Sequence, residues 1–259
     1  MRAITKLLQI VIWLALTVAG FHALAAKEPL YDGLGSYSRN ITTKSAEAQR
    51  YFDQGLGFLH GFNHRAAIRG FQQAAELDPQ CAMAHWGVAL ACGPHINSIA
   101  VPAAAAELAW KELELAQKNA GNASPVERAL IGALAKRYAN QQPEDRSGLN
   151  RAYADAMREV WKEYPKDPDV GALFAEAMMN LRPWDQWTPE GKPEPGTDEV
   201  LATLEAVGAK VESEASLRES SLHSRGGSIA ESGTRERRGG PTSRFTAGPR
   251  SQRAYAIAQ

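Results

Sequence analysis

The sequence has few cysteines, no excess of charge of either sign and only one long hydrophobic run. Its 259 residues include two cysteines, and 29 basic residues balance 29 acidic ones. A dedicated nucleic-acid-binding protein normally carries a basic face, so the neutral balance argues against that class. Gly-x-Ser-x-Gly, His-Glu-x-x-His, phosphate-binding loops and dinucleotide fingerprints are also absent. We therefore predict neither an enzyme nor a protein that needs a cofactor or a metal.

The hydrophobic run lies at the amino terminus. Arg2 and Lys6 start the chain, residues 7–21 are nearly all apolar, and residues 23–25 read Ala-Leu-Ala. This three-part pattern is typical of a secretory signal peptide, and the run is short for a membrane span, which needs about 20 apolar residues. We predict a signal peptide over residues 1–25, a mature chain without a membrane span, and a periplasmic or secreted location. An uncleaved N-terminal anchor is the alternative interpretation.

The two cysteines, Cys81 and Cys92, flank a predicted helix. At about 1.5 Å per residue, their separation along that helix is about 16 Å. A disulfide requires Cα atoms within about 7 Å of each other. Although export permits disulfides, we therefore predict two unpaired, buried thiols.

The strongest pattern in the chain covers residues 51–79. A tetratricopeptide repeat (TPR) is a helical hairpin of about 34 residues with small and large side chains at fixed offsets. The small residues let two helices approach closely, the aromatic residues fill the space between them, and a final proline ends the hairpin. The residues that match these offsets are Tyr51, Gly55, Phe58, Ala67, Phe71, Ala74 and Pro79.

The pattern then restarts with an insertion. A second hairpin is predicted from helices over 82–92 and 103–119, separated by the long loop 93–102. No strand pattern is visible anywhere. We predict an all-α fold of TPR-like antiparallel hairpins, stacked as a short right-handed superhelix. It occupies residues 46–211, after an irregular segment over 26–45 and an N-cap at Ser45. The later helices are predicted over 125–139, 147–164 and 170–181, and from Thr197 onward with Val200, Leu201, Leu204 and Val207 on one face.

The tail over residues 212–259 has a different composition. It is rich in serine, arginine and glycine, contains no lysine and has few large apolar residues. Such a segment cannot bury enough surface to offset its ordering entropy, so a disordered tail is predicted. An alternative hypothesis is out-of-frame translation, because the composition changes within a good helical pattern.

The first helices of TPR hairpins line the concave face of the array. In this chain that face is predicted to be apolar, whereas sites that grip a terminal carboxylate use Lys, Arg and Asn. An apolar groove for a peptide or protein partner is therefore predicted. The alternative is that these side chains belong to the core and pack against Trp184 or Trp187. The groove residues predicted in this way are Phe52, Leu56, Leu59, Met83, Trp86 and Leu90.

Histidines gather in and beside the first two hairpins, at His60, His64, His85 and His95. His60 and His64 are four residues apart, a spacing that places two metal ligands on one helical face. However, the intervening Gly61 and Asn63 predict that the helix ends between them. Polar contacts that hold the hairpin turn are therefore preferred over a metal site.

These stretches resemble exported bacterial TPR proteins of unassigned function. The resemblance covers about residues 41–207 and implies that the array continues with further histidine-bearing repeats. This chain departs from the pattern after Val207, which favours a truncated or frameshifted copy. The resemblance supplies no reaction. The stretches that carry it are AQRYFDQG (48–55), GFNH (61–64), CAMAHWGVALA (81–91), GPHIN (93–97) and LRPWDQWTP (181–189).

The resemblance adds candidate binding residues to the predicted groove. They form three clusters, namely Phe62-Asn63-His64, His95 to Asn97, and Trp184-Asp185. The first functional hypothesis is an extracytoplasmic TPR scaffold that binds a protein or peptide. The second is a metal- or small-molecule-binding protein that uses the histidines and the Trp-Asp loop, and the third is a non-functional truncated copy.

Overall fold

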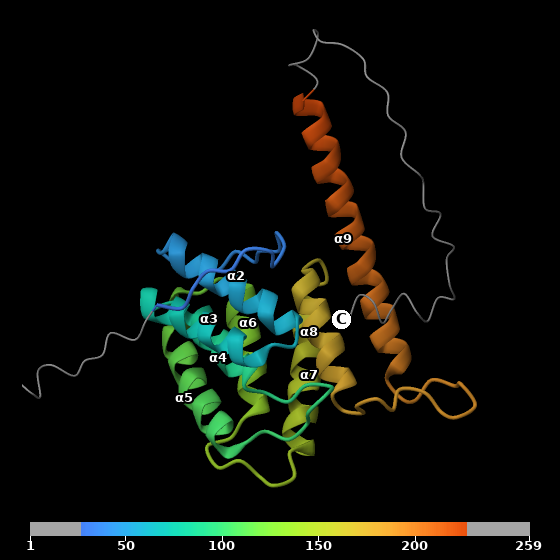
Figure 1. Cartoon of the computed structure of the whole chain (residues 1–259). Helices are drawn as coiled ribbons and strands as arrows, with labels where there is room; N and C mark the ends of the chain where they lie inside the picture. Colours follow the sequence, from blue (N-terminus) through green and yellow to red (C-terminus); the bar gives the residue numbers. More distant parts are fainter. Residues whose placement is uncertain (1–26, 227–259) are drawn as a thin grey trace, which may run out of the picture. The chain divides into compact units, whose positions relative to one another are not determined.

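The computed structural model describes the backbone of residues 27–226 and the side chains of residues 27–212. Every regular element in this part of the chain is a helix, which confirms the predicted all-α class (Figure 1). The predicted signal peptide, residues 1–25, lies outside the described residues. The helices are α2 (Ala46–His60), α3 (His64–Leu77), α4 (Ala82–Ala91), α5 (Ala103–Asn119), α6 (Pro125–Leu134), α7 (Ser147–Glu163), α8 (Pro168–Met179) and α9 (Thr197–Gly226), with short 3-10 turns η1 (Ala120–Asn122) and η2 (Ala135–Arg137).

Side-chain caps set several helix starts. The Ser45 hydroxyl accepts a hydrogen bond from the Ala48 N–H at 3.1 Å, as predicted for the start of α2. Ser124 and Glu127 form a reciprocal capping box at the start of α6. Each cap satisfies backbone donors that the first helical turn leaves unpaired. Local sequence therefore fixes these boundaries.

Phe71 on α3 is the centre of the first hairpin. A Cβ atom added at Gly55 on α2 would lie 2.5 Å from the Phe71 ring, and one added at Gly87 on α4 would lie 2.6 Å from it. Glycine at both positions is therefore required for the three helices to close around the ring. The Phe52 ring, at a centroid distance of 5.3 Å, covers another side of Phe71. The close approach of Gly55 to Phe71 is the one that the small-and-aromatic pattern predicts, whereas Gly87 and Phe52 lie outside that pattern.

Neighbouring helices pack on one another along most of the chain. α2 contacts α3, α3 contacts α4 and α4 contacts α5, while α7 and α8 form a pair against which the first part of α9 packs (Figure 1). The buried Trp86 indole N–H on α4 donates to the Leu130 carbonyl of α6 at 3.3 Å and so links these two helices. The arrangement is an all-helical fold of repeat-like hairpins.

Residues 31–45 contain no helix but are held by carboxylates of the helical body. Arg39 pairs with Asp167 at 2.9 Å and with Asp169 at 2.5 Å, at the start of α8. The Thr42 N–H and hydroxyl donate to the buried Glu127 carboxylate at 2.7 and 2.6 Å. The irregular segment thus joins the start of α6 to the start of α8.

The last helix departs from the expected boundary. α9 continues to Gly226, whereas the irregular tail was predicted from residue 212. Residues 227–259 lie outside the described residues, so their disorder and the out-of-frame hypothesis stay predictions. None of the described helices is both long enough and apolar enough to cross a membrane.

Cys81 and Cys92 are unpaired and buried, as predicted. Burial raises the pKa of the Cys81 thiol to about 11 and that of Cys92 to about 12. A thiolate is the nucleophilic form of cysteine, so both side chains are inert near neutral pH.

Candidate functional site

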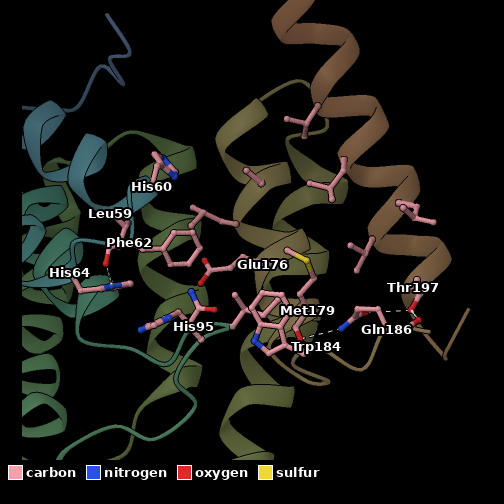
Figure 2. Close-up of a pocket in the computed structure, with 18 of the residues that line it drawn as sticks. Leu59, His60, Phe62, His64, His95, Glu176, Met179, Trp184, Gln186 and Thr197 are labelled. Carbon is pink, nitrogen blue, oxygen red and sulfur yellow. Dashed lines mark hydrogen bonds between the residues drawn. The ribbon is translucent and has the colours of Figure 1, made fainter. Parts of the chain in front are cut away.

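A pocket of about 470 Å³ lies between the α2–α3 turn, the loop 93–102, α8 and α9 (Figure 2). We call it the groove. Apolar side chains make up most of its wall, and its polar members are mainly histidines, Glu176 and Gln186. The apolar residues that line it are Leu59, Phe62, Ile96, Ala172, Leu173, Met179, Trp184, Trp187, Val200, Leu201, Leu204 and Val207.

One wall of the groove is built by the α8–α9 pair. α9 presents the apolar face that its helical period predicts, and Val200, Leu204 and Val207 are each 5% exposed. The two helices approach closely at Gly171, where an added Cβ would lie 2.5 Å from Val207. α9 therefore packs against α8, and apolar side chains near the start of α9 face the groove.

The opposite wall carries two stacked histidines. The rings of His64 and His95 lie 4.1 Å apart at an interplanar angle of 15°. The Phe62 ring packs edge-on against both, at 6.2 Å from His64 and 6.0 Å from His95. The His64 Nδ1–H donates to the Phe62 carbonyl at 3.1 Å, which fixes its tautomer (Figure 2). A residue of the α2–α3 turn region and the loop 93–102 thus meet through these rings.

His95 retains unused hydrogen-bonding capacity. Its Nδ1 is buried and has no hydrogen-bond partner. Burial, together with the nearby His64, lowers the pKa of His95, and Glu176 only partly opposes this effect. The imidazole is therefore neutral at pH 7, and it offers one hydrogen-bonding nitrogen beside an otherwise apolar wall.

Two residues at the groove hold unusual backbone conformations. Phe62 and Trp184 have φ angles of 57° and 61°, and no other non-glycine residue of the described chain has positive φ. Bulky side chains rarely adopt this left-handed conformation, and its cost is tolerated mainly where function requires it. Phe62 is held by the tight α2–α3 turn, in which the Asn63 N–H donates to the Phe58 carbonyl at 2.8 Å.

Trp184 is displayed by a loop that is tied at both ends. The Gln186 side-chain amide donates to the Arg182 carbonyl at 2.5 Å, and the Thr197 hydroxyl donates to the Gln186 carbonyl at 2.7 Å. The loop is thereby fixed to α9, and the Trp184 side chain remains 60% exposed at the rim of the groove. The backbone therefore presents this large apolar surface to solvent.

The structure brings several predicted site residues together at the groove. Asn63 is not among them, because its side chain caps α3 by accepting from the Ala66 N–H at 3.3 Å. Asp185 is outside the groove as well and pairs with Arg182 at 3.3 Å. The predicted residues that do line the groove are Leu59, His60, Phe62, His64, His95, Ile96, Asn97 and Trp184.

Five residues predicted for the apolar groove lie in the core instead. The physical reason is that α3, α4 and α6 close over them, as the packing of Phe71 and Trp86 shows. No partner can reach these side chains, which matches the alternative interpretation of their apolar character. The residues, each at 5% exposure or less, are Phe52, Leu56, Met83, Trp86 and Leu90.

Sequence reasoning missed the α8 wall and the glutamate in it. Ala172, Leu173, Glu176 and Met179 all line the groove. Their spacing is that of one helical face, so the periodicity of α8 marks them as a group. Only the fold shows that this face meets the histidines.

As predicted, the helix that contains His60 ends before His64. α2 ends at His60 and α3 begins at His64, so the two side chains do not share a helical face. The His60 ring instead packs against Tyr37 at 5.6 Å. His85 is remote from them and bonds to Glu112 at 2.6 Å and to the Pro79 carbonyl at 3.1 Å. Within the described part of the chain, no three His, Cys, Asp or Glu side chains are arranged to hold a metal ion.

The chain was compared with protein-family models, curated protein sequences and solved structures. None of the three comparisons gives a match. The geometry of the groove is therefore the basis for a functional conclusion.

Proposed function

We propose that this chain is an exported helical scaffold whose groove binds an apolar segment of a peptide or protein partner. The hairpins are TPR-like and form a short right-handed superhelix in this proposal. The packing of the Phe71 ring against Gly55 supports the hairpin assignment, because these two residues occupy an aromatic and a small position of the repeat. Export to the periplasm or the medium is proposed from the pattern of residues 1–25.

The observation that carries the proposal is the set of exposed aromatic rings at the groove. Phe62 and Trp187 are each 38% exposed and Trp184 is 60% exposed, and all three line the same apolar pocket. Contiguous exposed apolar surface marks interaction sites, and aromatic residues dominate the energy of such sites. Two of the three residues, Phe62 and Trp184, also have left-handed backbone conformations, so the exposure of their rings is maintained at an energetic cost.

The polar members of the groove supply a fixed point for a bound segment. His95 Nδ1 has no partner, and Glu176 lies on the facing helix. A backbone N–H or C=O of an extended peptide can pair with such groups while its side chains enter the apolar part. Main-chain hydrogen bonds that hold the peptide, combined with apolar pockets for its side chains, are typical of peptide-binding grooves.

A small apolar molecule is the second candidate ligand, and the size of the groove favours it. A volume of about 470 Å³ falls within the range of about 300–1,000 Å³ that is usual for small-molecule sites. The same His95 and Glu176 would then orient one polar group of that molecule. The two candidates share the groove and differ in what fills it.

A peptide-display selection tests the first candidate. A displayed random-peptide library is panned against the wild-type chain and against Ala172→Trp, which fills the groove from α8. Peptides with apolar anchors should be enriched on the wild type, and their affinity should fall at least about tenfold, or about 1.4 kcal/mol, in the variant. Ile99→Ala is the matched control, because Ile99 is 44% exposed yet does not line the groove.

The outcome distinguishes the two candidates. Anilinonaphthalene sulfonate, an apolar fluorescent dye, is titrated in parallel into the wild type and Ala172→Trp. Dye binding that the variant loses, without enrichment of any peptide, would replace the first candidate by the second. Peptide binding that is equal in the wild type and Ala172→Trp would reject the groove as the site.

A further inference from the structure

The inserted loop 93–102 also borders a second cavity, of about 860 Å³. Residues 95–97 line the groove, whereas residues 99–101 line this second cavity. Its remaining wall comes from the start of α5, the loop before α7, the first turns of α7 and the segment after α8, and it includes apolar side chains such as Val101, Ala106 and Leu181. We call it the polar cavity. Its polar lining residues are Gln142, Glu144, Asp145, Arg146, Ser147, Asn150, Arg151 and Asn180.

Arg146, in the wall of this cavity, is a buried cation without a counter-ion. It is 9% exposed, donates to the Arg137 carbonyl at 2.8 Å and donates to the Gln142 side-chain oxygen. Both acceptors are neutral, and its Nε has no partner. Within residues 27–212, no carboxylate forms an ion pair with Arg146. A buried charge of this kind is unfavourable unless an opposite charge compensates it.

A second buried guanidinium increases the excess of positive charge. Arg137 is 1% exposed, donates to the Pro94 carbonyl at 2.5 Å and lies 4.6 Å from the centre of the Tyr153 ring. It also forms no ion pair with a carboxylate in the part of the chain whose side chains are described. Burial lowers the pKa of Arg146. Tyr138, whose ring centre lies 5.5 Å from the guanidinium, opposes this effect, and the positive charge of Arg137 adds to it. An anion beside Arg146 would oppose the effects of burial and of Arg137.

The two asparagines of the cavity wall are also incompletely bonded. Asn150 is 7% exposed and Asn180 is 4% exposed, and the Oδ1 of each lacks a hydrogen-bond partner. The orientation of the Asn180 amide is set by its Nδ2, which donates to the Pro94 carbonyl at 3.5 Å and to Glu176 at 3.3 Å. Its free oxygen therefore requires a donor. Buried polar groups in proteins are rarely left in this state.

We propose that the polar cavity binds a small amino acid or hydroxy acid, whose carboxylate pairs with Arg146 and whose amine or hydroxyl donates to Asn180. The ligand carboxylate replaces the neutral Gln142 oxygen as the acceptor for Arg146, because a hydrogen bond between two opposite charges is stronger than one from the guanidinium to a neutral amide oxygen. Arg151 supplies a further positive charge in the wall. The exposed carboxylates of Glu144 and Asp145 in the same lining disfavour polyanions such as phosphate.

A ligand-binding experiment tests the proposal directly. The melting temperature of the wild type is followed while common amino acids, lactate or glycolate are added, with sodium chloride at matched ionic strength and inorganic phosphate as comparisons. A saturable rise with at least one amino or hydroxy acid, absent with chloride, is expected. No response beyond that to chloride, or a response to phosphate alone, would overturn the proposal.

Gln142→Glu provides a test that does not depend on the identity of the ligand. The new carboxylate occupies the acceptor position beside Arg146, so the response to ligand should disappear; because the substitution also removes the hydrogen bond that the Gln142 amide donates to the Ala139 carbonyl, the response to ligand is the readout. Gln141→Glu is the matched control, because Gln141 is exposed and does not line the cavity. A ligand response that Gln142→Glu retains would contradict the assignment of Arg146.

The polar cavity and the groove can be tested separately. Ala172→Trp fills the groove and should leave the response to amino or hydroxy acids unchanged. Arg146→Gln should lose that response while keeping peptide binding. If Arg146→Gln does not fold, Gln142→Glu and its control decide the question.

Discussion

The groove and the polar cavity differ in what their walls leave unsatisfied. The groove exposes apolar surface, with the Trp184 side chain 60% open to solvent. The polar cavity instead holds buried hydrogen-bonding atoms without partners, on Arg146, Asn150 and Asn180. Exposed apolar area attracts apolar partners, whereas unpaired buried polar atoms attract a small polar ligand. The two sites therefore select different chemical classes.

One inserted loop contributes to both sites. His95 and Ser98 exchange backbone hydrogen bonds of 3.0 and 2.8 Å, which close a tight turn within residues 93–102. Residues 95–97 line the groove, and residues 99–101 line the polar cavity. The buried Arg137 anchors the base of the loop at the Pro94 carbonyl. The comparison teaches that a single loop can separate two sites whose remaining walls come from different helices, α8 and α9 for the groove and α7 for the polar cavity.

Loss of the shared anchor should have the largest effect and should disturb both sites together. Arg137→Ala removes the hydrogen bond to Pro94 and the contact with the Tyr153 ring, leaving a void and a Pro94 carbonyl that keeps only the long hydrogen bond from Asn180. We expect the free energy of unfolding to fall by about 3 kcal/mol, as measured by urea denaturation. Lys136→Ala, at an exposed neighbouring position, should change it by less than about 0.5 kcal/mol. If only one site is perturbed in Arg137→Ala, the loop is not their common support.

The pH dependence of stability should distinguish the groove from the packed helical core. The pKa of His95 in the groove is lowered by burial and by His64. The unfolded chain therefore binds more protons as pH falls below about 6.5. Stability should decrease from that pH down to the folded-state pKa. His95→Gln should flatten this acidic limb in urea denaturation at a series of pH values.

His85 should give the opposite sign. Burial opposes its protonation, but the hydrogen bonds with Glu112 and Pro79 outweigh this effect and raise its pKa. Its contribution to stability is complete below about pH 6.5 and is lost as pH rises through the raised folded-state pKa. His85→Gln should remove this alkaline decrease and leave the acidic limb intact. If the same limb of the pH profile of stability disappears in both His85→Gln and His95→Gln, the two histidines are coupled.

The smallest expected effect is a gain. Asparagine tolerates the left-handed backbone that Trp184 holds at a φ of 61°. Trp184→Asn should therefore raise the free energy of unfolding by about 0.5–1 kcal/mol while it weakens peptide binding in the display assay. Trp187→Asn is the control, because Trp187 lines the same groove without a positive φ. An equal gain in both variants would remove the argument from backbone strain.

Much of the helical framework follows from the sequence. The helix predicted over 103–119 matches α5, and α4 and α7 each end one residue before their predicted ends. Ser45, Ser124 and Pro125 mark helix starts by local hydrogen bonding and by the fixed φ of proline, so no tertiary information is needed. The break between His60 and His64 is predicted for the same reason.

The site is predicted less well because burial depends on what covers a face. Phe52 and Trp86 have the apolar character expected of a groove, but the same character suits a core, and neighbouring helices cover them. Glu176 gives no signal of its own, since a single acidic residue on an amphipathic helix is ordinary. Its meeting with His95 joins segments 81 residues apart in the sequence, which no local pattern encodes.

The sequence by itself determined the helices, their caps, the small-and-aromatic packing around Phe71 and the unpaired state of Cys81 and Cys92. These features depend on residues that are close along the chain or repeat at a helical period. Only the tertiary structure decided which apolar faces stay open, and that the loop 93–102 separates an apolar groove from a polar cavity. The physical reason is that exposure and unsatisfied hydrogen bonding are properties of neighbours in space, and the packing of α8 and α9 supplies those neighbours.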